Sequence, residues 1–167
     1  MGFFPVQLLI RRKMALFYSP PGKINRMFES EVTSQDQALC HLLFHCCLQD
    51  GRFEESEVDK VSEIFVQFGL QHNLNFKEEL RRYRGYISSV TNEQDYINHL
   101  VGVIMPVNDL ALLSLCYELA LADDNLSSQE EALLIKIAES LDITAEENEV
   151  VKKLMVQRRV IASEKIC

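Results

Sequence analysis

Two short acidic segments contain the side chains of this chain that are best suited to hold a metal ion. Residues 49–57 are Gln-Asp-Gly-Arg-Phe-Glu-Glu-Ser-Glu, and residues 122–130, seventy-three positions later, are Ala-Asp-Asp-Asn-Leu-Ser-Ser-Gln-Glu. Each segment has an Asp followed seven positions later by a Glu. Carboxylate oxygens are preferred ligands of Ca²⁺ and other hard divalent cations. The resulting candidate metal ligands are Asp50, Glu57, Asp123 and Glu130.

The spacing from Asp to Glu equals that in the second half of an EF-hand loop, but the first half is missing. The positions that would carry the earlier acids hold Cys46 and Leu48 in one segment and Leu119 and Leu121 in the other. Neither segment alone is therefore a complete EF-hand. A cation site would need further oxygens from the other segment, from a backbone carbonyl or from water.

The same acids have two other interpretations. Ser127 with Glu130 fits a capping box, in which the Glu side chain accepts a hydrogen bond from the backbone at the start of a helix. In this interpretation the acids only cap helices in a scaffold domain. In the third interpretation they hold the metal of a hydrolase, which requires an open coordination position.

The elements that position these acids are predicted to be α-helices, because glycine and proline are scarce and apolar residues recur at helical spacing. Asp50 lies four residues after Cys46 and so extends the apolar stripe of its helix, and the other three acids lie at stripe ends in the same way. Capping pairs are expected at Asn75 with Glu78, Thr91 with Gln94 and Thr144 with Glu147. The predicted helices are 24–31, 34–48, 54–69, 76–88, 93–104, 107–121, 127–141 and 145–161.

The predicted fold class is all-α, a single helical-bundle domain of about seven or eight helices. Shifted by seventy-three residues, the chain matches itself at ten positions between residues 24 and 70. This self-similarity predicts two pseudo-repeated four-helix units, 23–88 and 93–161, inside one domain of residues 23–167. Residues 1–22 are expected to be a poorly ordered or mis-annotated extension, with Met14 as an alternative start to Met1.

The net charge of −8 is unevenly distributed along the chain. Residues 1–30 contain five Lys or Arg and one acid, whereas the rest contains twelve and twenty-four. An acidic body argues against nucleic acid as a partner. The apolar stretch at residues 3–10 is too short to span a bilayer, so no export signal or transmembrane helix is predicted. Peripheral membrane association through this stretch and the basic residues after it is a weaker alternative.

The five cysteines include no Cys-x-x-Cys pair, which favours a reducing, cytoplasmic location. Cys46 and Cys47 are expected to be buried structural residues rather than nucleophiles. His41 and His45 stand four apart, a spacing that can bind zinc, but no further ligands accompany them and they are expected to lie on the surface.

Two basic clusters are expected to be solvated helix surface, with a docking face for an acidic protein as the alternative. They consist of Arg81, Arg82 and Arg84, and of Lys152, Lys153, Arg158 and Arg159.

The pattern Ala-Asp-Gly-x-apolar-x-x-x-Glu at a helix-turn-helix junction, present twice in a helical domain, resembles the TerB-like family of tellurite resistance. In this chain Gln49 replaces the Ala of the first copy and Asp124 replaces the Gly of the second. The resemblance covers residues 24–160 and implies a compact helical domain, with divalent-cation binding at Asp50, Glu57, Asp123 and Glu130. It also implies a link to stress response through protein partners near the inner membrane. The expected function is therefore non-enzymatic cation binding, Ca²⁺ above all, together with binding of a protein partner.

Overall fold

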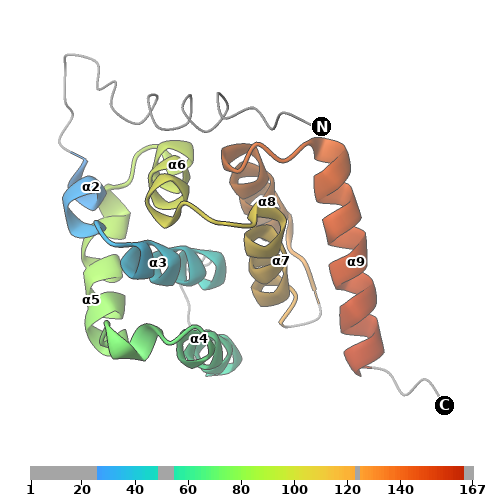
Figure 1. Cartoon of the computed structure of the whole chain (residues 1–167), viewed down its shortest axis with the longest axis horizontal. Helices are drawn as coiled ribbons and strands as arrows, with labels where there is room; N and C mark the ends of the chain where they lie inside the picture. The colour runs from blue at the N-terminus through green and yellow to red at the C-terminus, as the bar shows by residue number, and fades with distance from the viewer. Residues whose placement is uncertain (1–25, 49–54, 123–124, 164–167) are drawn as a thin grey trace, which may run out of the picture.

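The computed structural model describes residues 26–48, 55–122 and 125–163 of the chain, and every described element is helical (Figure 1). The predicted all-α fold is confirmed, and the eight predicted helices are present with ends that differ by at most three residues. The described elements are α2 (Met27–Glu31), α3 (Gln35–Cys47), α4 (Glu55–Gln67), η1 (Leu70–His72), α5 (Phe76–Tyr86), η2 (Ile87–Ser89), α6 (Glu93–Ile104), α7 (Asp109–Ala120), α8 (Ser128–Ser140) and α9 (Ala145–Ser163).

Helix α3 is the centre of the bundle. It packs against α4, α5, α6 and α7, and all but one of the residues from Ala38 to Cys47 are buried (Figure 1). A helix enclosed on this many sides has no solvated face, so its polar residues must find partners inside the protein.

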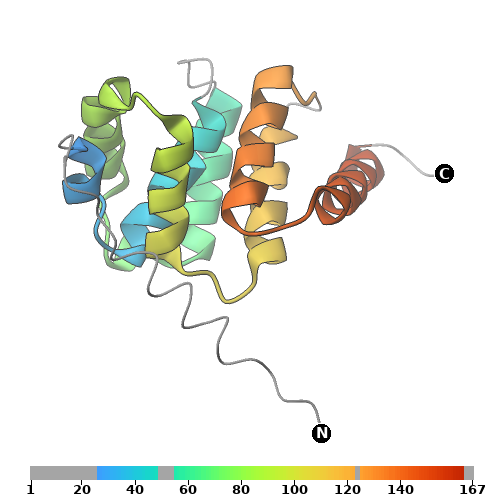
Figure 2. The same ribbon diagram turned by 90° about the horizontal axis from the view of Figure 1, so that it is seen from above.

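Helices α7 and α8 pair beside this centre, and α9 covers them at the edge of the molecule (Figures 1 and 2). The core that holds the helices together is apolar and aromatic, with Tyr86, Tyr96 and Tyr117 among its largest fully buried side chains. None of the described helices is both long and apolar enough to cross a bilayer.

The N-caps explain several helix starts. Thr144 and Glu147 cap α9 as predicted, with the Glu147 carboxylate accepting from the Thr144 N–H at 2.9 Å. The Asn75 side chain caps α5 by accepting from the Glu78 N–H at 3.2 Å. Helix α3 has a capping box of its own, between Ser34 and Gln37, that sequence analysis did not identify.

The predicted capping pair of Thr91 and Gln94 is wrong. Helix α6 is capped by Asn92, whose side chain accepts from the Asp95 N–H at 3.2 Å. An Asn side chain is a better N-cap than Thr, and Asn92 directly precedes the predicted and observed helix start at Glu93. This leaves Gln94 free to donate to the Ser140 hydroxyl of α8 at 2.8 Å, so that it joins two helices instead.

The bounds of the helices fit the seventy-three-residue shift. Residues 55–67 of α4, for example, map onto residues 128–140 of α8. A common three-dimensional arrangement of the two halves stays a prediction, as does the division of the chain into an extension at 1–22 and a domain at 23–167.

Candidate functional site

Glu130 is the only one of the four predicted metal ligands whose side chain the structure describes. Asp50 and Asp123 lie outside the described residues, and Glu57 lies in helix α4 with a side chain that is also outside them. The convergence of the four acids therefore stays a prediction. Among the described residues, no three His, Cys, Asp or Glu side chains are grouped so that they could hold a metal ion.

Glu130 forms the predicted capping box at the start of α8. The Glu130 N–H donates to the Ser127 hydroxyl at 3.2 Å, and the Ser127 N–H donates to Glu130 Oε2 at 2.7 Å. Within the described part of the chain, the second carboxylate oxygen, Oε1, has no hydrogen bond. A carboxylate with one oxygen in a cap can still offer the other to a cation, so the residue fits both interpretations of its role.

Two helices that each precede an acidic segment meet close to Glu130. Cys46, near the end of α3, shares a hydrogen bond with Cys116 of α7. That bond and burial hold the pKa of the Cys46 thiol well above its ordinary value, and the negative charge of Glu130 raises it further. Glu130 therefore acts electrostatically on the end of α3, four residues before Asp50.

A second polar cluster, absent from the predictions, lies inside the bundle around His41. Its Nε2 is 3.0 Å from Oε2 of Glu79 on α5, and its Nδ1 is 2.5 Å from the hydroxyl of Tyr86. The Tyr86 hydroxyl is in turn 2.7 Å from that of Tyr96 on α6. We refer to Glu79, His41, Tyr86 and Tyr96 as the His41 network.

The chemistry of the donors fixes the direction of these bonds. Burial lowers the pKa of His41, although the hydrogen bond and charge of Glu79 oppose the shift, so the imidazole is neutral near pH 7. The carboxylate of Glu79 needs a donor, which places the proton of His41 on Nε2 and leaves Nδ1 to accept from the Tyr86 hydroxyl. Burial also raises the pKa of Tyr86 and of Tyr96, which keeps both hydroxyls protonated.

His45, one turn later, repeats this arrangement with other partners. Its Nδ1 is 2.9 Å from the hydroxyl of Tyr83, and its Nε2 is 3.0 Å from Oε1 of Glu93 on α6. The other oxygen of Glu93 is 2.5 Å from Nζ of Lys136 on α8. The two histidines thus join α3 to α5 and α6, and Glu93 extends the connection to α8.

The prediction that His41 and His45 lie on the surface is wrong. Their side chains are 0% and 10% exposed. Helices α5 and α6 cover the face of α3 that lies outside its apolar stripe, and this face was expected to be exposed to solvent. The complementary residues were visible in the sequence: Glu79, Tyr83 and Tyr86 lie on one face of a later helix at spacings of four and three. Side chains at these spacings can form hydrogen bonds with two histidines that lie one helical turn apart on a neighbouring helix.

The cysteine prediction is confirmed. Cys46 and Cys47 are 2% and 5% exposed, and Cys40 and Cys116 are fully buried. Burial also raises the pKa of the Cys40 thiol above its ordinary range, with a further contribution from Glu79. Buried thiols of this kind are poor nucleophiles.

The family model described as "Tellurite resistance protein TerB" matches residues 35–153, which include the whole of helices α3 to α8 and the N-terminal part of α9. Comparison with curated proteins and with solved structures gives no significant match. The matched region covers more than two thirds of the chain and contains most of the helical bundle described above. On this evidence, the chain belongs to the TerB family of tellurite resistance proteins.

Proposed function

We propose that this protein is a non-enzymatic TerB module that binds a divalent cation, Ca²⁺ above all, and acts in stress response through a protein partner. The proposed ligands are Asp50, Glu57, Asp123 and Glu130. The observation that carries this proposal is the match of the TerB family model to residues 35–153, a range that contains all four acids. The geometry of Glu130 supports it, because only one oxygen of its carboxylate is used in the cap of α8.

Electrostatics explain why a cation would bind at the two acidic segments. The C-terminal end of a helix carries a partial negative charge, so an Asp that follows it is destabilised by roughly 0.3–1 kcal/mol. The sequence places Asp50 after α3 and Asp123 after α7. A cation bound among carboxylates would offset both the dipoles and the mutual repulsion of the acids.

Calorimetric titration with Ca²⁺ and with Mg²⁺ tests the proposal. The wild-type chain should bind Ca²⁺, and the double variant Glu57→Gln/Glu130→Gln should bind it at least about tenfold more weakly, because two charged ligands are lost. Absence of Ca²⁺ and Mg²⁺ binding by the wild-type chain would overturn the cation site.

The capping box of Ser127 and Glu130 supports a second candidate function, a scaffold domain whose acids only stabilise helix starts. In that case Glu130→Gln lowers the melting temperature, and added Ca²⁺ leaves the melting temperature of the wild-type chain unchanged. Thermal unfolding with and without Ca²⁺ separates the two functions.

We also propose that the protein works in the cytoplasm. Four cysteines are described, none of them in a disulfide, and all four are buried in the core, including Cys46 and Cys116, which contact each other across two helices. Reduced thiols in contact persist in a reducing compartment.

A further inference from the structure

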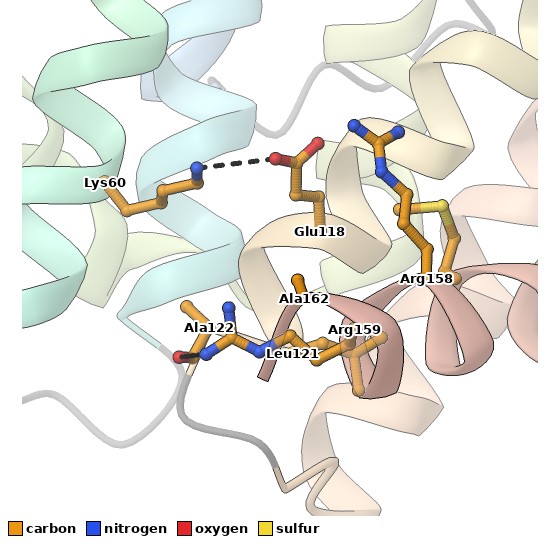
Figure 3. Close-up of a pocket in the computed structure, with 8 residues that line it drawn as sticks. Lys60, Glu118, Leu121, Ala122, Arg158, Arg159 and Ala162 are labelled. Atoms are coloured by element: carbon orange, nitrogen blue, oxygen red, sulfur yellow. Dashed lines mark hydrogen bonds and ion pairs between the residues drawn. The ribbon is translucent and has the colours of Figure 1, made fainter. Parts of the chain in front are cut away.

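A groove with an apolar floor and a cationic rim lies between α4, α7 and the C-terminal half of α9 (Figure 3). Its volume is about 310 Å³, and Leu121 and Ala122, which directly follow α7, form its floor with Met155 and Ala162 of α9. We call it the α9 groove. A cavity of this size accommodates one or two apolar side chains of a partner.

The rim carries three cations and one acid. Lys60 of α4 lies 3.4 Å from Glu118 of α7, and Arg159 donates to the Ala122 carbonyl at 2.8 Å. Arg158 also lines the groove (Figure 3), and none of the ion pairs among the described residues includes it. The rim therefore has an excess of positive charge, in a chain whose net charge is −8.

An exposed apolar stripe runs along α9 beside the groove. Val150, Leu154 and Ile161 are 56%, 59% and 62% exposed and follow one another at helical spacing. Leu154 and Ile161 flank Arg158 in the sequence by four and three positions, so they share its side of the helix. Apolar side chains next to a cationic rim are typical of a protein-binding surface.

The positive charge of the rim determines which kind of segment can bind in the α9 groove. The N-terminal segment of this chain carries five Lys or Arg and one acid in residues 1–30, so the cationic rim repels it. A partner with carboxylates and apolar side chains matches both the rim and the floor. We propose that the α9 groove binds an acidic, amphipathic peptide segment of another protein, with a carboxylate paired to Arg158 and an apolar side chain on Leu121 and Met155.

This inference deepens the proposed function, because it rests on the action of the module through a protein partner and names the chemistry of that partner. It does not require the cation site. The binding experiment is therefore performed in the presence of a chelator, and the Ca²⁺ titration is performed separately. If the chain binds Ca²⁺ but does not bind the peptide, the groove proposal is wrong and the proposed cation site is unaffected.

The probe is a fluorescent peptide of about fifteen residues in which Leu recurs at alternating spacings of three and four and Glu fills the other positions, so that a helix of this peptide has one apolar face. A matched peptide carries Lys in place of Glu. The full chain should bind the Glu peptide, measured by fluorescence anisotropy at concentrations up to about 1 mM, and Arg158→Glu should weaken this binding about tenfold. The Lys peptide should bind Arg158→Glu more tightly than it binds the wild-type chain.

Arg81→Glu on α5 is the matched control, because it makes the same change of charge on an exposed residue outside the groove. It should leave the affinity for the Glu peptide within about twofold of the wild-type value. Equal weakening by both variants, or no binding of the Glu peptide to the wild-type chain, would overturn the proposal. So would light scattering that shows a dimer which Arg158→Glu dissociates, because the occupant would then be a second copy.

Discussion

The imidazole of His41 and the carboxylate of Glu79 form a buried pair at the contact of α3 with α5, with Nε2 3.0 Å from Oε2. Their side chains are 0% and 6% exposed. On the solvent side of Glu79, Arg82 lies 3.7 Å from the same oxygen and 3.6 Å from Glu31. The pair holds the His41 ring in one tautomer and so orders the hydroxyls of Tyr86 and Tyr96 behind it.

Protonation of His41 should destabilise the fold. Burial lowers the pKa of His41 below its ordinary value near 6.5, against the opposing effect of Glu79. The unfolded chain therefore binds more protons as the pH falls through about 6.5, and the free energy of unfolding decreases there by up to about 1.4 kcal/mol per pH unit. The stability that His41 contributes is complete above that pH and is lost below it.

Urea unfolding at a series of pH values between about 5 and 8 measures this effect. The variant His41→Gln should be less stable at pH 8 and should show a shallower decline toward pH 5. The control is His72→Gln, because His72 is exposed and lies outside the network. A decline of equal slope in wild type and His41→Gln would contradict the assignment.

Removal of the central hydroxyl of the His41 network should be costly. In Tyr86→Phe, Nδ1 of His41 loses its donor at 2.5 Å and the Tyr96 hydroxyl loses its partner at 2.7 Å, and both groups stay buried. Buried polar groups left without partners cost about 1–3 kcal/mol each. We expect a loss of about 2–6 kcal/mol in the free energy of unfolding, measured by chemical denaturation.

Tyr117→Phe is the comparison for this loss. The Tyr117 hydroxyl donates to Asn148 at 2.9 Å, and Asn148, unlike Tyr117, is partly exposed to solvent. Water can replace the lost partner there, so the expected cost is about 0.5–1.5 kcal/mol. Equal losses in the two variants would show that the His41 network contributes no more than an ordinary hydrogen bond.

The network also shows how far sequence reasoning extends in this chain. Helix positions follow from local patterns, namely apolar periodicity, scarce Gly and Pro, and caps such as Ser127 with Glu130, and these were predicted to within a few residues. The burial of His41 depends on which helix covers that face of α3. This is a contact between residues thirty-eight positions apart, and no local pattern contains it. The prediction of a surface position assumed that α3 has one apolar face and one face exposed to solvent. A helix at the centre of the bundle has no face exposed to solvent.

The candidate cation site was predictable to a smaller extent. Duplication and spacing identified the four acids, and the cap at Glu130 followed from its position three residues after Ser127. The meeting of α3 and α7 through Cys46 and Cys116 was not predictable, because it depends on how two helices seventy residues apart pack. The TerB match covers the helices around this contact.

The buried thiols should be unreactive in the folded protein. Burial and the bond to Cys116 raise the pKa of Cys46, and burial raises that of Cys40, so neither forms the thiolate that reacts with disulfide reagents. In Cys167→Ser, which removes the one cysteine outside the described residues, a thiol-specific disulfide reagent should label no cysteine in buffer and all four in denaturant. Rapid labelling in buffer would contradict the burial of α3.

The two roles of the α8 cap can be separated by mutating its two members. Ser127→Ala removes the hydroxyl that accepts the Glu130 N–H at 3.2 Å, and should lower the free energy of unfolding by about 1 kcal/mol. It leaves the carboxylate of Glu130 in place, so Ca²⁺ affinity in calorimetry should stay within about threefold of the wild-type value.

Glu130→Gln keeps an acceptor for the Ser127 N–H and so should cost less stability than Ser127→Ala. It removes a charged ligand, however, and should weaken Ca²⁺ binding at least about tenfold. Capping alone predicts the same ranking in stability, because that ranking follows from the hydrogen bonds of the cap. It predicts no effect of either variant on calcium, so the loss of Ca²⁺ affinity in Glu130→Gln alone separates the ligand role from the cap.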